Sequence, residues 1–430
     1  MEQPVLLKSV LVQDPQGPWH NQVVDILIQG GMVKDIGTTL SDDNALVLQR
    51  EGSTVSMGWV DGQAHFREPG EETKEGLLQG LHAASQGGFT AVGVLPSTNP
   101  CVDHASAVRN VNAVAAEAHR QGVPSIPLPL ACLSEGRNGL QLAEMHDLSE
   151  AGAAAFTDDA PIEKASMLQR ALTYSQMHGK TVADVPLEQH FNAGGMMHEG
   201  KVSTEMGLTG IPHEAETLRV TRDLDVLKYT GGRLHLSPIT CATSVDLIRQ
   251  AKQDGLQVTC ATTAAHLMYS EEDMKGFNGT LRVRSPFRTS KDREALRHGV
   301  LDGTIDAVVS DHRPEDLEHH DVEFMLSPEG IASLPSAFGL ALSGLLDTAS
   351  NASDAIDAVV RAFTEGPRHV LSMEQGHVDA GTPCDLTWFH PGLTHVAHNA
   401  SKGVNLPPLP DSLKGQVLGV FKEDRRWTAG

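Results

Sequence analysis

Two periodicities of hydrophobic and polar residues alternate along most of this chain. From Thr54 onward, short β-branched apolar segments recur, and most precede a stretch whose apolar residues are spaced three and four apart. Strands that alternate with helices in this way are typical of an α/β protein, and eight such units predict a (β/α)8 barrel. The expected strands are Thr54–Val60, Phe89–Leu95, Ser125–Leu130, Ala153–Phe156, Thr181–Val185, Arg233–Pro238, Gln257–Thr262 and Ile305–Ser310, and the expected helices include Glu72–Ser85, His104–Arg120, Ala165–His178, Glu214–Lys228, Ser244–Gln253 and Lys291–Leu301.

The two ends of the chain follow a different pattern, in which hydrophobic and polar residues alternate one by one. Near the amino end, two such runs are separated by Gly30-Gly31, which is typical of a β-hairpin with a two-residue turn. Near the carboxyl end, Asp385–Phe389 and Gly415–Phe421 alternate in the same way. We therefore expect the two ends to pair into one small β-sandwich domain, residues 1–53 plus 376–430, beside a barrel domain of residues 54–375.

Composition and charge argue against several classes of protein. Of the 430 residues, 40% are hydrophobic, and 33 Lys and Arg stand against 55 Asp and Glu, for a net charge of −22. This acidic balance argues against binding to nucleic acid or to an anionic membrane surface, because both need basic patches. No apolar run approaches the roughly 20 residues that span a bilayer, and the amino end shows no signal-peptide pattern. The five cysteines are scattered without a CxxC pair, which fits a reducing cytoplasm and argues against a thiolate zinc site.

The segments that follow four of the expected strands carry the polar residues of interest, because active sites of (β/α)8 barrels lie at the carboxyl ends of the strands. The first strand leads into Gln-x-His-x-Arg-Glu-Pro-Gly at residues 63–70, and the second into Pro-Ser-Thr-Asn-Pro at 96–100. The fourth leads into Thr-Asp-Asp at 157–159, and the eighth into Ser-Asp-His-x-Pro at 310–314. In this order, these runs resemble dihydroorotase of the amidohydrolase superfamily. Further matches, among them His198–Ser203, Thr230–His235 and Ser285–Arg288, extend the resemblance over nearly the whole chain.

The resemblance implies a cytoplasmic enzyme of pyrimidine biosynthesis that opens or closes the dihydroorotate ring at one or two zinc ions. We also expect it to be a homo-oligomer. Zinc in such a site lowers the pKa of a bridging water, so that hydroxide forms at neutral pH. The family's ligands are a His-x-His pair after strand one, a carboxylate after strand four and one histidine after each of strands five and six. An aspartate after strand eight completes the set and also shuttles the proton.

Transferred to this chain, that ligand set is incomplete. The His-x-His pair is Gln63-x-His65, the strand-five position falls at Val182, and the strand-six position falls at Pro238. Valine and proline side chains have no lone pair, and an amide oxygen is a weak substitute for the imidazole that zinc prefers. The expected remnant is His65, Asp158 or Asp159, and Asp311, with Asp311 as the catalytic proton shuttle and zinc as the metal if any binds. His312, His319 and His320 are an alternative source of imidazole, although loop histidines are more often solvated.

The positions that would bind substrate are half retained. Arg67 matches the family arginine that holds the substrate carboxylate, where a planar guanidinium gives bidentate recognition. Its alternative role is a salt bridge to Glu68 or Asp61 at the rim of the barrel. Ser97 replaces the family's partner asparagine, and Asn99 lies two residues further along the chain.

Three hypotheses of function follow. In the first, the chain is a dihydroorotase-like protein of pyrimidine biosynthesis that has lost its zinc site and serves as a non-catalytic partner or scaffold. Degenerate members of the family pair with aspartate transcarbamoylase, which is then the expected partner. In the second, the chain is a working dihydroorotase or other cyclic-amide hydrolase with a reorganised or single-metal site. In the third, it binds a small carboxylate through Arg67 in the old pocket.

Overall fold

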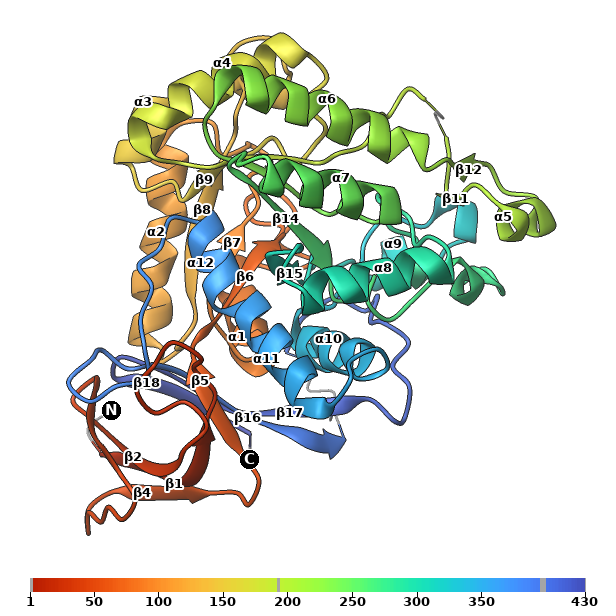
Figure 1. The fold of residues 1–430 in the computed structure, drawn as a ribbon. Coiled ribbons are helices and arrows are strands. Elements are labelled where there is room, and N and C mark those ends of the chain that lie inside the picture. Colours follow the sequence, from red (N-terminus) through yellow and green to blue (C-terminus); the bar gives the residue numbers. More distant parts are fainter. Residues whose placement is uncertain (1–2, 192–193, 395–399, 430) are drawn as a thin grey trace.

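The computed structural model describes residues 3–191, 194–394 and 400–429. At its centre, eight parallel strands form a barrel surrounded by helices, which confirms the expected fold class (Figure 1). The last strand closes against the first through the bridge between Ala64 and His312. Around the barrel, the strands follow one another in chain order: β6 (Trp59–Ala64), β7 (Phe89–Val94), β8 (Ile126–Ala131), β9 (Ala155–Phe156), β10 (Val182–Asp184), β13 (Leu234–Leu236), β14 (Val258–Thr263) and β15 (Ala307–Val309).

Helices cover the outside of the barrel, and each expected helix is present (Figure 1). The first begins at Leu77 rather than at Glu72, because the carboxylate of Glu68 accepts a hydrogen bond from the Leu77 N–H at 2.7 Å and caps the first turn there. The helices are α1 (Leu77–Gly87), α2 (Ala105–Arg120), α3 (Met145–Glu150), α4 (Ala165–Ser175), α5 (Lys201–Met206), α6 (Glu214–Thr230), α7 (Ala242–Gln253), α8 (Ser290–Leu301), α9 (Leu317–His320), α10 (Ala337–Leu346), α11 (Ala352–Phe363) and α12 (Glu365–Val370).

The first expected strand, Thr54–Val60, is in fact two strands that belong to different sheets. β5 (Thr54–Met57) pairs with the chain ends, and only β6 enters the barrel. Between them, Gly58 lies against the side chains of Asp385 and Thr90, where a β-carbon would overlap both. The hydrophobic pattern runs through this point without a break, so periodicity alone could not separate the two strands.

Both ends of the chain form one eight-stranded sheet, which confirms that the two ends pair. Gly30 and Gly31 link β2 to β3 with φ angles of 59° and 77°, as a two-residue hairpin turn requires. β5 pairs with β1 on one side and with β16 on the other, so it joins the amino-terminal strands to the carboxyl-terminal ones. The other strands of this sheet are β1 (Val5–Val12), β2 (Val23–Gln29), β3 (Met32–Gly37), β4 (Leu46–Gln49), β16 (Asp385–Thr394), β17 (Lys414–Lys422) and β18 (Arg425–Thr428). A separate two-stranded sheet consists of β11 (Met197–His198) and β12 (Gly210–Ile211).

Trp59 fixes the amino end of β6 between the barrel and the end sheet. Its fully buried ring lies 4.6 Å from that of Phe338 and 5.1 Å from that of Phe389, measured between ring centroids. Burial of one large apolar side chain contributes roughly 1.5–3 kcal/mol to stability, so this end of the strand is firmly held. The opposite end of the strand carries Gln63 and leads to His65, the first two residues of the candidate site.

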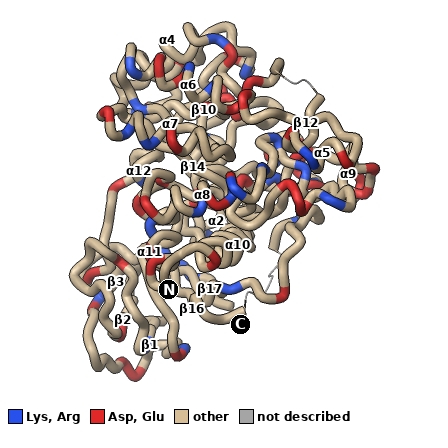
Figure 2. The backbone as a smooth tube through the Cα atoms, turned by 45° about the vertical axis from the view of Figure 1, so that its right-hand side comes forward, with Lys and Arg blue, Asp and Glu red and all other residues tan. Residues whose placement is uncertain are grey.

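Acidic and basic residues are interspersed along the chain, on the barrel as well as on the end sheet (Figure 2). In some pairs only one partner is buried: the fully buried guanidinium of Arg219 lies 3.1 Å from Glu188 and 3.3 Å from Glu163, whose side chains are partly exposed. Within the residues that the structure describes, no helix is long and apolar enough to cross a membrane.

Candidate functional site

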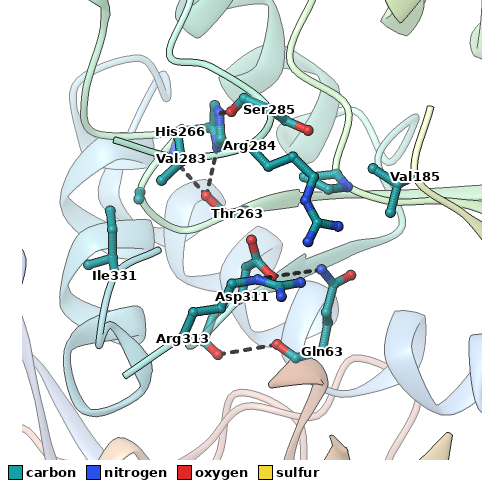
Figure 3. Close-up of a pocket in the computed structure, with 13 residues that line it drawn as sticks. Gln63, Val185, Thr263, His266, Val283, Arg284, Ser285, Asp311, Arg313 and Ile331 are labelled. Atoms are coloured by element: carbon teal, nitrogen blue, oxygen red, sulfur yellow. Dashed lines mark hydrogen bonds and ion pairs between the residues drawn. The ribbon is translucent and has the colours of Figure 1, made fainter. Parts of the chain in front are cut away.

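Polar side chains from four barrel strands meet at the carboxyl ends of these strands, and Figure 3 shows three of them, Gln63, Asp311 and Arg313, beside the cavity. Gln63 belongs to β6, Asp159 follows β9, Ser237 follows β13, and Asp311 and Arg313 follow β15. Hydrogen bonds and ion pairs connect these side chains into one network. The cavity beside it has a volume of about 20 Å³, which is room for about one water molecule. Side chains therefore fill the place where the active site of a barrel enzyme lies.

Arg313 is the centre of this network. Its Nη1 lies 3.0 Å from Asp159 Oδ2, its Nη2 lies 2.5 Å from Asp159 Oδ1, and its Nε lies 3.0 Å from Asp311 Oδ1. Burial alone would lower the pKa of Arg313, but the two carboxylates outweigh burial and raise this pKa above its usual value. The guanidinium is therefore a permanent positive charge between the two carboxylates that the sequence proposes as metal ligands.

Asp159 is also held by interactions with Ser97 and Arg284, in addition to those with Arg313. The Ser97 hydroxyl donates to Asp159 Oδ2 at 2.5 Å, and Arg284 Nη1 lies 2.8 Å from the Asp159 carbonyl oxygen and 3.4 Å from Oδ1. Burial would raise the pKa of Asp159, but the charges of Arg313 and Arg284 hold it well below its usual value. The carboxylate is thus ionised, buried and fully paired with cations and donors from this chain.

Gln63, which stands where the family has a histidine, uses both ends of its amide within the network. Its Nε2 donates to Asp311 Oδ1 at 2.8 Å, and its Oε1 accepts a hydrogen bond from the Ser237 hydroxyl at 2.9 Å. Asp311 Oδ1 therefore receives hydrogen bonds from both Gln63 and Arg313. The amide completes a chain of contacts that joins β6, β13 and β15.

His65 has no lone pair directed at the centre of the site. Its Nδ1 accepts a hydrogen bond from the Arg67 backbone N–H at 3.0 Å, which places the ring proton on Nε2. Nε2 then donates to the Ser97 carbonyl oxygen at 3.1 Å. Burial, followed by the charges of Arg67 and Arg313, lowers the pKa of His65 to about 3. The imidazole is neutral, and both of its nitrogens are used by the backbone.

A second histidine at this end of the barrel, His266, was not among the expected site residues, and it is bound in a similar way. Its Nδ1 lies 2.7 Å from the Thr263 hydroxyl, and its Nε2 lies 2.9 Å from the Ser285 carbonyl oxygen. Because a carbonyl oxygen only accepts, Nε2 carries the proton and Nδ1 accepts from Thr263. Burial lowers the pKa of His266 to about 4.

The structure distinguishes the two candidate carboxylates after β9. Asp158 turns away from the site and accepts hydrogen bonds from the N–H groups of Leu133 and Ser134 at 2.8 and 2.9 Å and from the Ser134 hydroxyl at 2.5 Å. These contacts fix the loop that follows β8. Asp159 is the carboxylate that faces Arg313 and Asp311.

The strand-five position requires a correction. Val182, where the sequence places the lost histidine, is fully buried in the main hydrophobic core and does not line the cavity. Val185, three residues later, lines the cavity together with Pro238. The predicted position was three residues too early, because β10 ends only at Asp184. Residues beyond the carboxyl end of a barrel strand are the ones that reach the site. Pro238 does lie at the cavity, as the sequence predicts.

The expected substrate-binding residues occupy three different environments. Arg67 donates to Glu315 at 2.6 Å, to Glu71 at 3.2 Å and to the Pro314 carbonyl oxygen at 3.0 Å. Its ion pairs are therefore with Glu71 and Glu315, rather than with Glu68 or Asp61, the partners that the sequence offered. Ser97 belongs to the network through Asp159, whereas the side chain of Asn99 is exposed.

The three loop histidines lie outside this network. His312 is fully buried, with Nδ1 accepting from the Leu334 N–H at 3.3 Å and Nε2 lying 3.3 Å from Glu75. His319 Nδ1, on α9, lies 2.6 Å from Asp316, the residue that caps the amino end of this helix. The Nε2 of the third, His320, contacts a threonine hydroxyl at 3.4 Å.

These residues do not fit a binuclear zinc centre. Such a centre needs imidazole and carboxylate lone pairs that converge on the ions, together with one open position for water. Here the lone pairs of His65 are directed elsewhere, and Asp159 and Asp311 converge on the guanidinium of Arg313. Sequence reasoning missed the role of Arg313, although the signal was present: the variable position of the Ser-Asp-His-x-Pro run is an arginine beside a retained aspartate.

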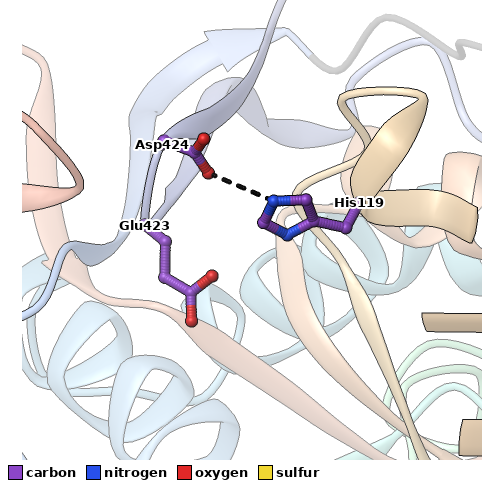
Figure 4. A group of neighbouring side chains, drawn as sticks. All are labelled: His119, Glu423 and Asp424. Atoms are coloured by element: carbon purple, nitrogen blue, oxygen red, sulfur yellow. Dashed lines mark ion pairs between the residues drawn. The ribbon is translucent and has the colours of Figure 1, made fainter. Parts of the chain in front are cut away.

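A separate group of possible donors lies on the surface beside the turn between β17 and β18 (Figure 4). His119 Nε2 lies 3.8 Å from Asp424 Oδ1, and Glu423 Oε2 lies 2.7 Å from Arg425 Nη2. The side chains of His119, Glu423 and Asp424 are all exposed, and Arg425 already neutralises Glu423. The arrangement is that of a surface ion-pair cluster.

The fold, a (β/α)8 barrel beside a sheet formed by both chain ends, is shared by solved structures of other proteins. The L-hydantoinase (dihydropyrimidinase) from Arthrobacter aurescens matches it with a TM-score of 0.80 at 17% sequence identity, covering 99% of this chain and 96% of that one. The dihydropyrimidinase from Brevibacillus agri matches with a TM-score of 0.77 at 18% identity, over 98% and 94% of the two chains. At this level of identity the likeness shows the fold.

The sequence defines the family more closely. A family model described as dihydro-orotase-like matches residues 52–244. The dihydroorotase of Pelotomaculum thermopropionicum is 36% identical over 415 residues, which cover 96% of this chain and 95% of that protein. The dihydroorotase of Syntrophus aciditrophicus is 34% identical over 427 residues, or 98% of each. The chain belongs to the dihydroorotase family.

Proposed function

We propose that this member of the dihydroorotase family is non-catalytic and acts as a scaffold or partner subunit in pyrimidine biosynthesis. The observation that carries the proposal is the position of Arg313, whose guanidinium lies between Asp159 and Asp311 in place of metal ions. Family membership supports the pathway, and the chemistry of this site supports the lack of turnover.

Hydrolysis of a cyclic amide needs an activated water, a polarised carbonyl group and an acceptor for the proton. Asp311 is the residue expected to move the proton, but its Oδ1 already accepts from Gln63 and Arg313. The second carboxylate, that of Asp159, is paired at both oxygens with Arg313 and also accepts from Ser97. The remaining groups of the network offer neutral amide and hydroxyl dipoles or a permanently charged guanidinium, none of which can deprotonate water at neutral pH. The small cavity beside the network supports the same proposal.

The proposed partner is aspartate transcarbamoylase, acting with a homo-oligomer of this chain in the cytoplasm. A scaffold needs an intact fold and surface rather than an intact active site, and the cross-linked network keeps the mouth of the barrel rigid without a metal. Co-purification of the tagged chain from its native host tests the partner. Stoichiometric recovery of aspartate transcarbamoylase supports the proposal. Absence of binding between the two proteins, each at micromolar concentration, contradicts it.

The second candidate is a working dihydroorotase with a reorganised or single-metal site. It is favoured by the relatives, which carry the name dihydroorotase and match this chain over nearly their whole length. A third candidate, carboxylate binding through Arg67, would require this arginine to leave Glu71 and Glu315.

Turnover of dihydroorotate and of carbamoyl aspartate separates the first two candidates. The purified chain is assayed in both directions, with and without added zinc, beside the Gln63→Ala variant as a matched control. We expect the wild-type rate to equal that of the control and to stay unchanged on addition of zinc. A wild-type kcat in the ordinary enzyme range of roughly 1–10³ per second, lost in the control, overturns the non-catalytic proposal.

A further inference from the structure

Two carboxylates are enclosed at the mouth of the barrel and need a compensating positive charge. The Asp159 side chain is 1% exposed, and that of Asp311 is 19% exposed. An ionised carboxylate without a cation in such surroundings is strongly unfavourable, because burial removes its hydration. Retention of both aspartates therefore has a structural cause that is independent of catalysis.

Three carboxylate oxygens surround a single cationic group at this point. Both oxygens of Asp159 face the two terminal nitrogens of Arg313 side by side, and Oδ1 of Asp311 faces Nε on the adjacent edge. In the strand order of the barrel, β9 and β15 stand on opposite sides, so the guanidinium bridges the barrel mouth. A divalent cation held by carboxylates from the same two strands would bridge it in the same way.

We infer that Arg313 is a built-in replacement for a metal cation, and that Asp159 and Asp311 form a latent site for one divalent cation that opens when this guanidinium is removed. The inference rests on the proposed function only in so far as both assume that the wild-type site holds no zinc. With the imidazole of His65 turned away, the donors are oxygens: the two carboxylates and, after rotation of its amide, Oε1 of Gln63. An all-oxygen set favours a hard cation such as Mn²⁺ over zinc.

Arg284 provides a matched control, since it also contacts Asp159 but does not lie between Asp159 and Asp311 as Arg313 does. It reaches Asp159 Oδ1 at 3.4 Å from the loop after β14, its side chain is 29% exposed, and its second carboxylate neighbour is Glu329 rather than Asp311. Removing Arg284 leaves Arg313 between the carboxylates. The Arg284→Ala variant is therefore expected to behave like the wild type toward metal.

The test is a titration of the purified full-length chain with Mn²⁺, followed by isothermal titration calorimetry and by thermal unfolding. We expect Arg313→Ala to bind about one Mn²⁺ per chain, at least about 100-fold more tightly than wild type or Arg284→Ala, and its unfolding temperature to rise with Mn²⁺ as linkage requires. Adding Asp159→Asn to Arg313→Ala is expected to abolish this binding. A folded Arg313→Ala protein that binds Mn²⁺ no better than wild type overturns the inference, as does stoichiometric Mn²⁺ binding by the wild type.

A second variant decides the case if Arg313→Ala does not accumulate as folded protein. Asp159→Asn combined with Arg313→Ala removes one buried negative charge together with the positive one, so it is expected to fold and to unfold at a temperature close to that of the wild type. Failure of this double variant to fold also overturns the inference, because Arg313 would then do more than neutralise the carboxylates. These readouts do not depend on turnover, so they can fail while the non-catalytic proposal stands.

Discussion

Arg313 and Asp159 form a side-on ion pair across the mouth of the barrel, with Nη1–Oδ2 and Nη2–Oδ1 distances of 3.0 and 2.5 Å. The two residues are 154 positions apart in sequence and follow strands on opposite sides of the barrel. Two parallel N–H···O contacts fix both the distance and the orientation of the groups. The pair is therefore a cross-link between opposite sides of the barrel mouth, at the position where the resemblance in sequence implies metal ligands.

Loss of the cation at this cross-link should destabilise the protein. Arg313→Ala leaves the carboxylate of Asp159 buried and without its main partner, and breaking one side of a buried ion pair typically costs about 3–5 kcal/mol. We expect a loss of this size in urea unfolding followed by circular dichroism. A loss below about 1 kcal/mol, as found for exposed pairs, would contradict the assignment of a buried, structural pair.

Removing both charges of the ion pair together should have little effect on the free energy of unfolding. In Asp159→Asn combined with Arg313→Met, both charges are gone, the methionine occupies much of the space of the arginine, and the asparagine can still accept from Ser97. Replacing a buried ion pair by uncharged groups of similar volume is often neutral or stabilising, so we expect unfolding within about 1 kcal/mol of wild type. A double variant as unstable as Arg313→Ala alone would show that shape, rather than charge, governs this position.

Buried histidines should make the fold sensitive to acid. Burial lowers the pKa values of His65 and His235 to about 3 and that of His266 to about 4. In the unfolded chain a histidine titrates near pH 6.5, so between that pH and the folded pKa the unfolded state binds more protons. The contribution of each such histidine to stability is therefore complete above about pH 6.5 and falls as the pH decreases, by up to about 1.4 kcal/mol per pH unit.

The acid sensitivity is measured as the free energy of unfolding between pH 7 and pH 4. His235→Gln should reduce the slope, because it removes one buried imidazole whose Nδ1 lies 2.9 Å from the Thr259 hydroxyl. The comparison variant is His319→Gln, in which an exposed histidine on α9 is replaced instead of a buried one. Equal slopes in wild type and His235→Gln would contradict the account.

Restoring the family's imidazoles should recover zinc only when Arg313 is also removed. Gln63→His, Val185→His and Pro238→His together place imidazoles at the cavity, but the guanidinium still occupies the centre. We expect fewer than about 0.1 zinc ions per chain in this triple variant and about one or more when Arg313→Ala is added, since catalytic zinc needs about three protein ligands. The control is a variant that carries Val182→His instead of Val185→His, because residue 182 lies in the core away from the cavity. Zinc loading of the triple variant with Arg313 intact would contradict the prediction.

The fold was largely predictable because it depends on patterns that are local in sequence. Eight apolar strands alternating with amphipathic helices, and the Gly30-Gly31 hairpin near one end, all show in the order of residues. The division at Gly58 was not predictable in this way. It results from the close approach of Asp385, more than 300 residues away, which periodicity cannot report.

The candidate site was predictable only in part. The motifs located Gln63, Asp159, Asp311 and Pro238 at the mouth of the barrel, because family resemblance fixes position in the chain. Which of two adjacent aspartates faces inward depends on the direction of the chain as it leaves β9, and the sequence left Asp158 and Asp159 equivalent. The tautomer of His65 depends on a backbone N–H, and the role of Arg313 depends on a partner across the barrel.

The zinc content of the purified wild-type chain tests the central claim most directly. The chain is purified without chelators, incubated with a slight excess of zinc, freed of unbound metal and analysed by mass spectrometry for zinc per polypeptide. With Arg313 between Asp159 and Asp311 and with His65 turned away, we expect fewer than about 0.1 zinc ions per chain, since a catalytic site needs about three available protein ligands. A value of about one or two zinc ions per chain that falls on Asp311→Ala substitution would show that metal displaces the guanidinium, and would contradict this account.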